Sequence, residues 1–136
     1  MKILAAVDGS GFSKRGLEQA IALAKAVGGE LTAVSVAGLV GQTDEMPPSI
    51  REKLLKEAEG VVAQSVEKAA AEGVKASGKV ISDSTPAAGI VDMAEEIEAD
   101  LIVIGAKGKS NLERFLTGSV ASTVTAQAGC SVLVVK

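Results

Sequence analysis

Histidine, tryptophan and tyrosine are absent from this 136-residue sequence, which contains one cysteine and two phenylalanines. Without histidine the chain cannot form a Ser-His-Asp or Cys-His catalytic unit, and it lacks the commonest general base near neutral pH. Its single cysteine, Cys130, cannot form an intrachain disulfide, and with no histidine available there is no cluster of soft ligands for zinc or copper. We therefore assign no catalytic residue and no metal ligand, and the cysteine content favours a reducing cytoplasm.

Aromatic residues and long apolar runs are also scarce. Aromatics make up 1% of the chain, which leaves few rings on which flavins or unstacked bases could lie. The net charge of −3 provides no basic surface for duplex nucleic acid. The first apolar run ends at Asp8 and is too short for a signal peptide or a membrane span. We therefore expect a soluble cytoplasmic protein that binds neither nucleic acid nor membranes.

The length and the hydrophobic content of 47% are those of one globular domain with a sizeable core, so we expect residues 1–136 to form a single domain. Five short runs within it have the composition of strands. Four lack the polar alternation of a half-solvated strand, which is typical of parallel strands buried on both faces. These four are Lys2 to Val7, Leu31 to Val36, Leu101 to Ile104 and Ser131 to Val135. The fifth, Val74 to Ile81, is more polar and is expected at an edge of the sheet.

Helical signals occupy the intervals between these runs, with apolar residues at a spacing of three to four. The expected boundaries are Ser13 as a cap and Gly28-Gly29 as a stop for the first helix, Pro47-Pro48 before the second, Thr85-Pro86 opening the third, and Gly118-Ser119 opening the fourth. The polar stretch from Ala37 to Glu45 is expected to form a mobile loop.

This alternation predicts an α/β fold with an open, doubly wound, Rossmann-like sheet of five parallel strands and helices on both faces. The expected strand order is 3-2-1-4-5. In such sheets ligands bind outside the carboxyl ends of the strands, where the strand order reverses. A ligand site is therefore expected where strands 1 and 4 end.

Strand 4 is followed by a segment with widely spaced glycines. Gly105 and Gly108 would let the backbone approach a ligand closely. Gly118 and Ser119 open the next helix, where backbone N–H groups and the helix dipole favour phosphate. This segment therefore predicts an anion site.

Polar side chains around these glycines strengthen that interpretation. Lys107 and Lys109 add positive charge and Ser110 adds a hydroxyl donor, a combination suited to a di- or triphosphate. Across the crevice, Asp8 can accept a hydrogen bond from a ribose hydroxyl. Nucleotide binding is thus the leading hypothesis.

Two standard nucleotide motifs are incomplete in the sequence. Gly108-Lys109-Ser110 would end a P-loop, but Val103 stands at the position of its first glycine. Lys14 stands where the dinucleotide-binding fingerprint requires its third glycine. A P-loop nucleotidase and an NAD enzyme are therefore both disfavoured.

The spacing of Gly105, Gly108 and Gly118-Ser119 resembles the G-x2-G-x9-G-[ST] signature of the ATP-binding branch of the universal stress protein family. The segments ILAAVDGS, LIVIGAKGKSNL and GSVAS with CSVLVV are similar to that family as well, so the resemblance extends over nearly the whole chain. It implies a cytoplasmic adenine-nucleotide binder, usually homodimeric, that acts in stress tolerance or regulation without a well-defined reaction.

The resemblance also implies roles for individual residues. Ala6, Val7 and Asp8 would line the adenine and ribose pocket, with Val36 against the base. The residues implied to hold ribose and phosphates are Gly105, Gly108, Lys109, Ser110, Gly118, Ser119 and Val120. The expected cofactor is ATP with Mg²⁺ on its phosphates.

Three functions stay open at this point. The leading one is a regulatory protein whose ATP-bound state is read by partners. The second is a slow ATPase or phosphotransferase in which Asp8 or Ser119 positions Mg²⁺ or accepts phosphate. The third is an interaction protein that works without nucleotide.

The last strand predicts the quaternary structure. Ser131 to Val135 should form an edge of the sheet and contains neither proline nor charge to block pairing with another chain. An isologous homodimer that joins two such strands antiparallel would satisfy their backbone groups by two-fold symmetry. The family resemblance also implies a homodimer.

Overall fold

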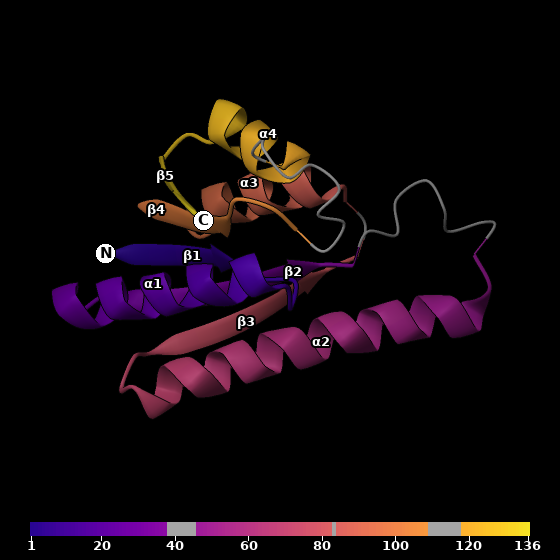
Figure 1. The fold of residues 1–136 in the computed structure, drawn as a ribbon, viewed down its shortest axis with the longest axis horizontal. Coiled ribbons are helices and arrows are strands. Elements are labelled where there is room, and N and C mark those ends of the chain that lie inside the picture. The colour runs from indigo at the N-terminus through magenta and orange to yellow at the C-terminus, as the bar shows by residue number, and fades with distance from the viewer. Residues whose placement is uncertain (38–45, 83, 109–117) are drawn as a thin grey trace.

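The computed structural model of the chain describes residues 1–37, 46–82, 84–108 and 118–136 (Figure 1). In these residues strands and helices alternate along the chain, as the sequence predicts. The strands are β1 (Lys2–Ala6), β2 (Glu30–Val36), β3 (Ala76–Ile81), β4 (Leu101–Gly105) and β5 (Ser131–Val135). The helices are α1 (Gly11–Val27), α2 (Pro48–Ala71), α3 (Pro86–Glu96) and α4 (Ser119–Gln127). The loop expected from Ala37 to Glu45 lies, except for Ala37, outside the described residues.

The strands form one parallel sheet in the order β3-β2-β1-β4-β5, which confirms the predicted topology. β1 lies at its centre, where Ile3 pairs with Leu31 of β2 on one side and with Leu101 of β4 on the other. The strand order reverses between β1 and β4. β3 and β5 are the two edges, as expected.

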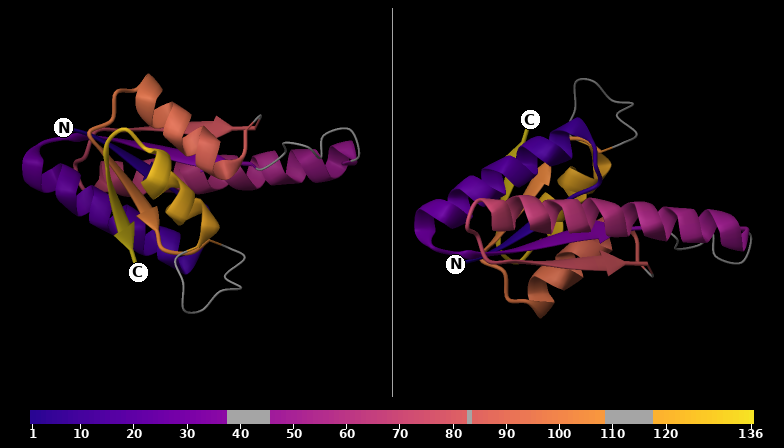
Figure 2. Two further views of the ribbon diagram at one scale, coloured as in Figure 1. Left: turned by 90° about the horizontal axis from the view of Figure 1, so that it is seen from above. Right: turned by 90° about the horizontal axis from the view of Figure 1, so that it is seen from below.

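Helices cover both faces of the sheet. Seen from above, α3 and α4 lie in front of the strands, and seen from below α1 and α2 do (Figure 2). Since successive side chains of a strand point to opposite faces, Ile3 and Val103 pack with α1 and α2, whereas Leu4 and Ile102 pack with α3 and α4. Each of these four is at most 1% exposed, and burial of one such side chain contributes about 1.5–3 kcal/mol.

Helix α1 begins three residues earlier than the sequence suggested. Ser10, not Ser13, is its N-cap, and the Ser10 hydroxyl accepts a hydrogen bond from the Ser13 N–H at 3.2 Å. Gly9 has a φ of 83°, a left-handed conformation that turns the chain into the helix at once. The expected cap at Ser13 is therefore wrong. The Ser13 side chain is instead buried in the first turn of α1, where its Oγ accepts a hydrogen bond from the Asp8 N–H at 2.9 Å.

The other predicted helix boundaries are close to the observed ones. Gly28 ends α1 with a φ of 65°, and its N–H donates to the Ala24 carbonyl. Thr85 is the N-cap of α3, with its hydroxyl accepting the Ala88 N–H at 3.4 Å, and Pro86 follows as the first helical residue. Among the described residues, no helix has both the length and the apolarity needed to cross a membrane.

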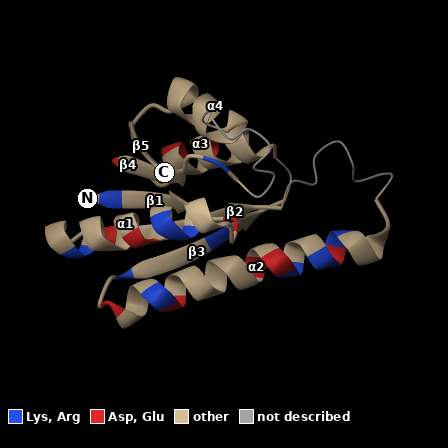
Figure 3. Cartoon of the chain, in the orientation of Figure 1, with Lys and Arg blue, Asp and Glu red and all other residues tan. Residues whose placement is uncertain are grey.

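Helix α2 is longer than the sheet that it covers. Its 24 residues span about 36 Å, whereas the six residues of β3 span about 20 Å. Its N-terminal part therefore extends past the carboxyl ends of the strands (Figure 1). Lysine, arginine and glutamate alternate along this part of the helix (Figure 3), as is typical of a solvated helix surface.

Candidate functional site

A cleft of about 430 Å³ lies at the carboxyl ends of β1 and β4, the position predicted from the strand order. One wall is apolar and comes from the ends of the central strands and from α3 and α4. Its main side chains are Val34, Val36, Pro86, Ile90, Ile104 and Ala121. The polar part of the lining is formed by Asp8, Ser13 and Lys107. The cleft thus pairs an apolar wall with a small set of polar groups, as ligand sites commonly do.

The structure brings most of the predicted site residues together. Those that line the cleft are Ala6, Val7, Asp8, Val36, Gly105, Gly108 and Val120. Gly118 and Ser119 lie next to it at the start of α4, since the Gly118 N–H donates to the carbonyl of the lining residue Ala106 at 2.6 Å. Lys109 and Ser110 lie outside the described residues.

Helix α3 and Ser13 also contribute to the cleft, although the sequence did not predict a site role for either. The sequence predicts Pro86 only as part of a helix start and assigns no site role to Ile90, yet both line the cleft. The signal was available in the topology, because α3 follows the carboxyl end of β3 and therefore begins at the same edge of the sheet. For Ser13, no such signal exists, because its position depends on where α1 begins.

Asp8 closes the turn that follows β1. Its Oδ1 accepts the Ser10 N–H at 2.9 Å, and its own N–H donates to the Ser13 hydroxyl. A Cβ on Gly108 would lie 3.0 Å from Asp8 Oδ2, so the carboxylate faces the backbone of the β4 loop closely. The Asp8 carboxylate therefore has a structural role in addition to any role in binding.

Gly105 has a packing role that the sequence did not predict. A Cβ there would lie 2.8 Å from Phe12 C and 2.9 Å from Ser13 N, both in the first turn of α1. Real Cβ atoms almost never approach backbone so closely, so the glycine lets α1 pack directly on the end of β4. The first glycine of the motif thus holds the two sides of the cleft together, although its backbone also lines the cleft.

Gly118 is a second glycine that packs closely against the backbone of another segment, here the one that follows β4. Its φ of −59° and ψ of 155° suit any residue, so the constraint is one of space and not of backbone conformation. A Cβ would lie 3.2 Å from the Ala106 carbonyl oxygen and 3.3 Å from Lys107 Cα. Since Gly118 provides no side-chain cap, the N–H groups of the first turn of α4 are suited to an anion beside Lys107.

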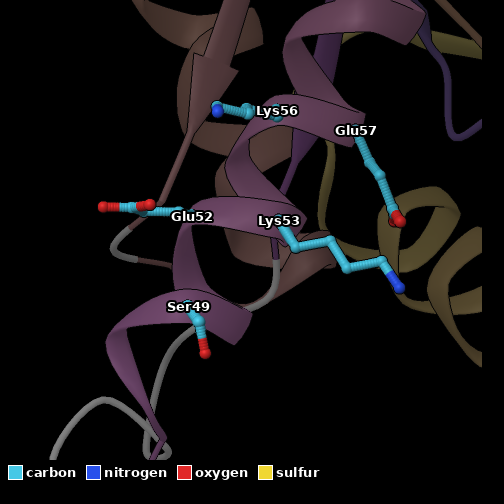
Figure 4. Close-up of a pocket in the computed structure, with 5 residues that line it drawn as sticks. All are labelled: Ser49, Glu52, Lys53, Lys56 and Glu57. Atoms are coloured by element: carbon cyan, nitrogen blue, oxygen red, sulfur yellow. The ribbon is translucent and has the colours of Figure 1, made fainter.

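A shallow hollow on the extended part of α2 is a weaker candidate. Figure 4 shows Lys53 and Glu57 pointing to one side of the helix and Glu52 and Lys56 to the other. Such pairs, four residues apart, contribute a few tenths of a kcal/mol to a helix. All four side chains are exposed, and none of the described residues that line the hollow has an apolar side chain. It is therefore explained by helix surface chemistry alone.

Cys130 is interpreted as a small, partly buried residue of the core and not as a redox centre. Burial raises the pKa of its thiol above the ordinary value of 9.0, and the negative charge of Asp100 acts in the same direction. We expect the rate of its reaction with a thiol reagent to rise with pH with a midpoint above 9.0 in the native protein.

In urea that midpoint should fall to the ordinary value, because unfolding restores solvation. By linkage, the native state keeps the thiol proton that the unfolded state has lost, so stability should decline as pH rises above about 9. Equal midpoints in native and unfolded protein would contradict the assigned burial.

Comparisons with known proteins agree with this fold. Residues 1–136 match the profile of the universal stress protein family. A universal stress protein of Methanocaldococcus jannaschii is 42% identical over 139 residues, covering 99% of this chain and 81% of the relative. YxiE of Bacillus subtilis, also a universal stress protein, is 34% identical over 146 residues, covering 99% and 98%.

Two solved structures of Archaeoglobus fulgidus universal stress proteins are similar in fold. One superposes with a TM-score of 0.83 at 27% identity, covering 100% of this chain and 98% of that one. The other, solved in complex with dAMP, has a TM-score of 0.76 at 28% identity, covering 100% and 98%. The full-length profile match and the 42% identical relative place this chain in the universal stress protein family.

Proposed function

We propose that this chain binds one molecule of ATP, with Mg²⁺ on its phosphates, in the cleft at the ends of β1 and β4. It acts as a cytoplasmic regulatory protein of the stress response, and its partners read the nucleotide-bound state. The observation that carries the proposal is the cleft itself, which has an apolar wall and lies beside the N-terminus of α4. There Gly118 packs closely against the backbone of Ala106 and Lys107. The cleft volume of about 430 Å³ is within the usual range for small-molecule sites.

The residues present fit the parts of such a nucleotide. Val36, Pro86 and Ile90 supply an apolar surface for the base. Asp8 supplies a carboxylate for a ribose hydroxyl, and Lys107 supplies positive charge for phosphate. Mg²⁺ ordinarily binds nucleotides through phosphate oxygens and retained waters, so it needs few protein ligands. The dAMP complex of the Archaeoglobus fulgidus relative supports an adenine nucleotide as the ligand.

The proposal includes a homodimer formed through β5. This strand is an edge of the sheet, and Leu133 on it is 36% exposed. An unprotected edge favours pairing with a second copy of the same strand.

Calorimetric titration of the purified protein with MgATP tests the proposal. We expect saturable binding of one ATP per chain. Any nucleotide that stays bound during purification should be detectable by its ultraviolet absorbance, because the chain has no Trp or Tyr. Single-turnover hydrolysis of bound ATP would favour the slow ATPase instead. Absence of binding would leave the nucleotide-independent interaction protein.

Substitution of Asp8 tests the ribose assignment. Asp8→Ala should weaken ATP and adenosine alike by about 1.5–3 kcal/mol, because one charge-assisted hydrogen bond is lost. Since Asp8 also accepts the Ser10 N–H, Asp8→Asn is the matched variant: its amide oxygen can keep that bond, and about half of the lost affinity should return. Titrations and thermal melts of both variants provide the measurement. Unchanged adenosine binding with loss of ATP would assign Asp8 to Mg²⁺ or phosphate.

A further inference from the structure

Gly89 is a buried residue in the second turn of α3. Glycine is a poor helix former, because it loses more backbone freedom on folding than any other residue. Neither a turn nor a left-handed conformation explains this glycine, because Gly89 lies inside the helix and is not among the residues with positive φ. Its presence therefore needs another physical reason.

The reason is a close approach between α3 and the end of β2. A Cβ on Gly89 would lie 3.0 Å from Val36 Cγ2 and 3.4 Å from Ile81 Cδ1. Because Gly89 has no side chain, α3 rests almost directly on Val36. Val36 lines the cleft, and so do Pro86 and Ile90, which flank Gly89 on the same helix.

We propose that Gly89 is a positioning residue that sets the width of the apolar end of the cleft through its contact with Val36. The inference rests on the proposed function, and it specifies which part of the ligand depends on the position of α3: the base. A methyl group at position 89 requires Val36 or α3 to move by a few tenths of an ångström. Either movement displaces a wall of the cleft.

Substitution of Gly89 should disturb the apolar end of the cleft and leave the end suited to phosphate unchanged. The atoms nearest to a Cβ on Gly89 belong to Val36 and Ile81, at the ends of β2 and β3, whereas the parts suited to phosphate are Gly108 and the start of α4. Gly89→Ala should therefore weaken adenosine and ATP by the same factor, about fivefold, and leave the ratio of their affinities unchanged. A general loosening of the fold would have no reason to preserve that ratio.

Calorimetric titration of wild type, Gly89→Ala and Gly60→Ala with adenosine and with MgATP is the test. Gly60 is the matched control because it also lies inside a helix, α2, and a Cβ there meets nothing within 4 Å. The control should bind both ligands as wild type does. Wild-type affinity in a folded Gly89→Ala would overturn the inference, as would a loss confined to ATP. Absence of adenosine and ATP binding by the wild type would overturn the proposed function itself.

Val36→Ala supplies the second arm, because it removes the methyl group that lies nearest to a Cβ at position 89 and leaves only the ordinary contacts with Ile81. In the Val36→Ala background, Gly89→Ala should cost less than twofold in adenosine affinity. An undiminished fivefold cost there would show that Gly89 does not act through Val36. If Gly89→Ala alone does not fold, the double variant decides: recovery of folding and adenosine binding supports the contact, and failure of the double variant to fold overturns it.

Discussion

Replacing Gly118 with valine is expected to weaken ATP binding by about a hundredfold, which corresponds to about 2.7 kcal/mol. Even a Cβ at this position would lie 3.2 Å from the Ala106 carbonyl oxygen and 3.3 Å from Lys107 Cα. Valine adds two methyl groups, so the segment after β4 must move away from the start of α4. Those two segments are the ones that we propose to hold the phosphates.

Gly129→Val is the matched control for this substitution. Gly129 is exposed, and a Cβ there meets nothing within 4 Å. Gly129→Val should bind ATP as the wild type does, whereas Gly118→Val should remain folded by circular dichroism and bind ATP about a hundredfold more weakly. If calorimetry finds unchanged ATP affinity in Gly118→Val, the assignment of the phosphate site is wrong.

Proline substitutions in β5 are expected to separate folding from dimerisation. The Ala106 N–H donates to the Val135 carbonyl at 2.7 Å, so the backbone groups of Val135 point toward β4. Because successive residues of a strand point their N–H groups to alternate sides, those of Leu133 also face β4 and those of Val134 face the open edge. Leu133→Pro should thus destabilise the fold by about 1–3 kcal/mol, and Val134→Pro should give a folded monomer or a weaker dimer.

Light scattering and thermal melting of both variants provide the measurement. The wild type should be dimeric at tens of micromolar, and each variant serves as the control for the other. A monomeric wild type, or a Val134→Pro variant that dimerises as the wild type does, would exclude the β5 dimer.

The fold could be predicted from local patterns. The apolar runs that became β1, β2, β4 and β5 carry no polar alternation, and the more polar β3 was correctly expected at an edge. Burial on both faces was wrong for β5, in which no residue is fully buried because this edge strand has a neighbouring strand on one side only. Caps such as Gly28 and Thr85 act through neighbours only a few residues away, so their effect can be derived from the sequence. The start of α1 was misplaced because Ser10 and Ser13 are equally good caps. The left-handed Gly9, which selects Ser10, has no distinctive signal.

The site was less predictable, because its key distances join residues far apart in the chain. Gly105 was predicted to lie against a ligand and does line the cleft, but nothing in the sequence indicated that the atoms nearest to its missing Cβ belong to Phe12 and Ser13 of α1. The contact of Gly89 with Val36 joins α3 to β2 in the same way. Such contacts depend on how the helices pack on the sheet, and the hydrophobic pattern of a single segment does not specify that packing.

The central position of β1 has a consequence for the order of folding. Its first partner, β2 (Glu30–Val36), follows after a single helix, but its other partner, β4, begins only at Leu101. Until β4 is synthesised, β1 is an edge strand of the nascent chain, with apolar side chains on both faces. Such an exposed edge can pair with the wrong strand or bind a chaperone. Closing that edge requires a loop of nearly a hundred residues, so we expect the docking of β4 to limit the folding rate.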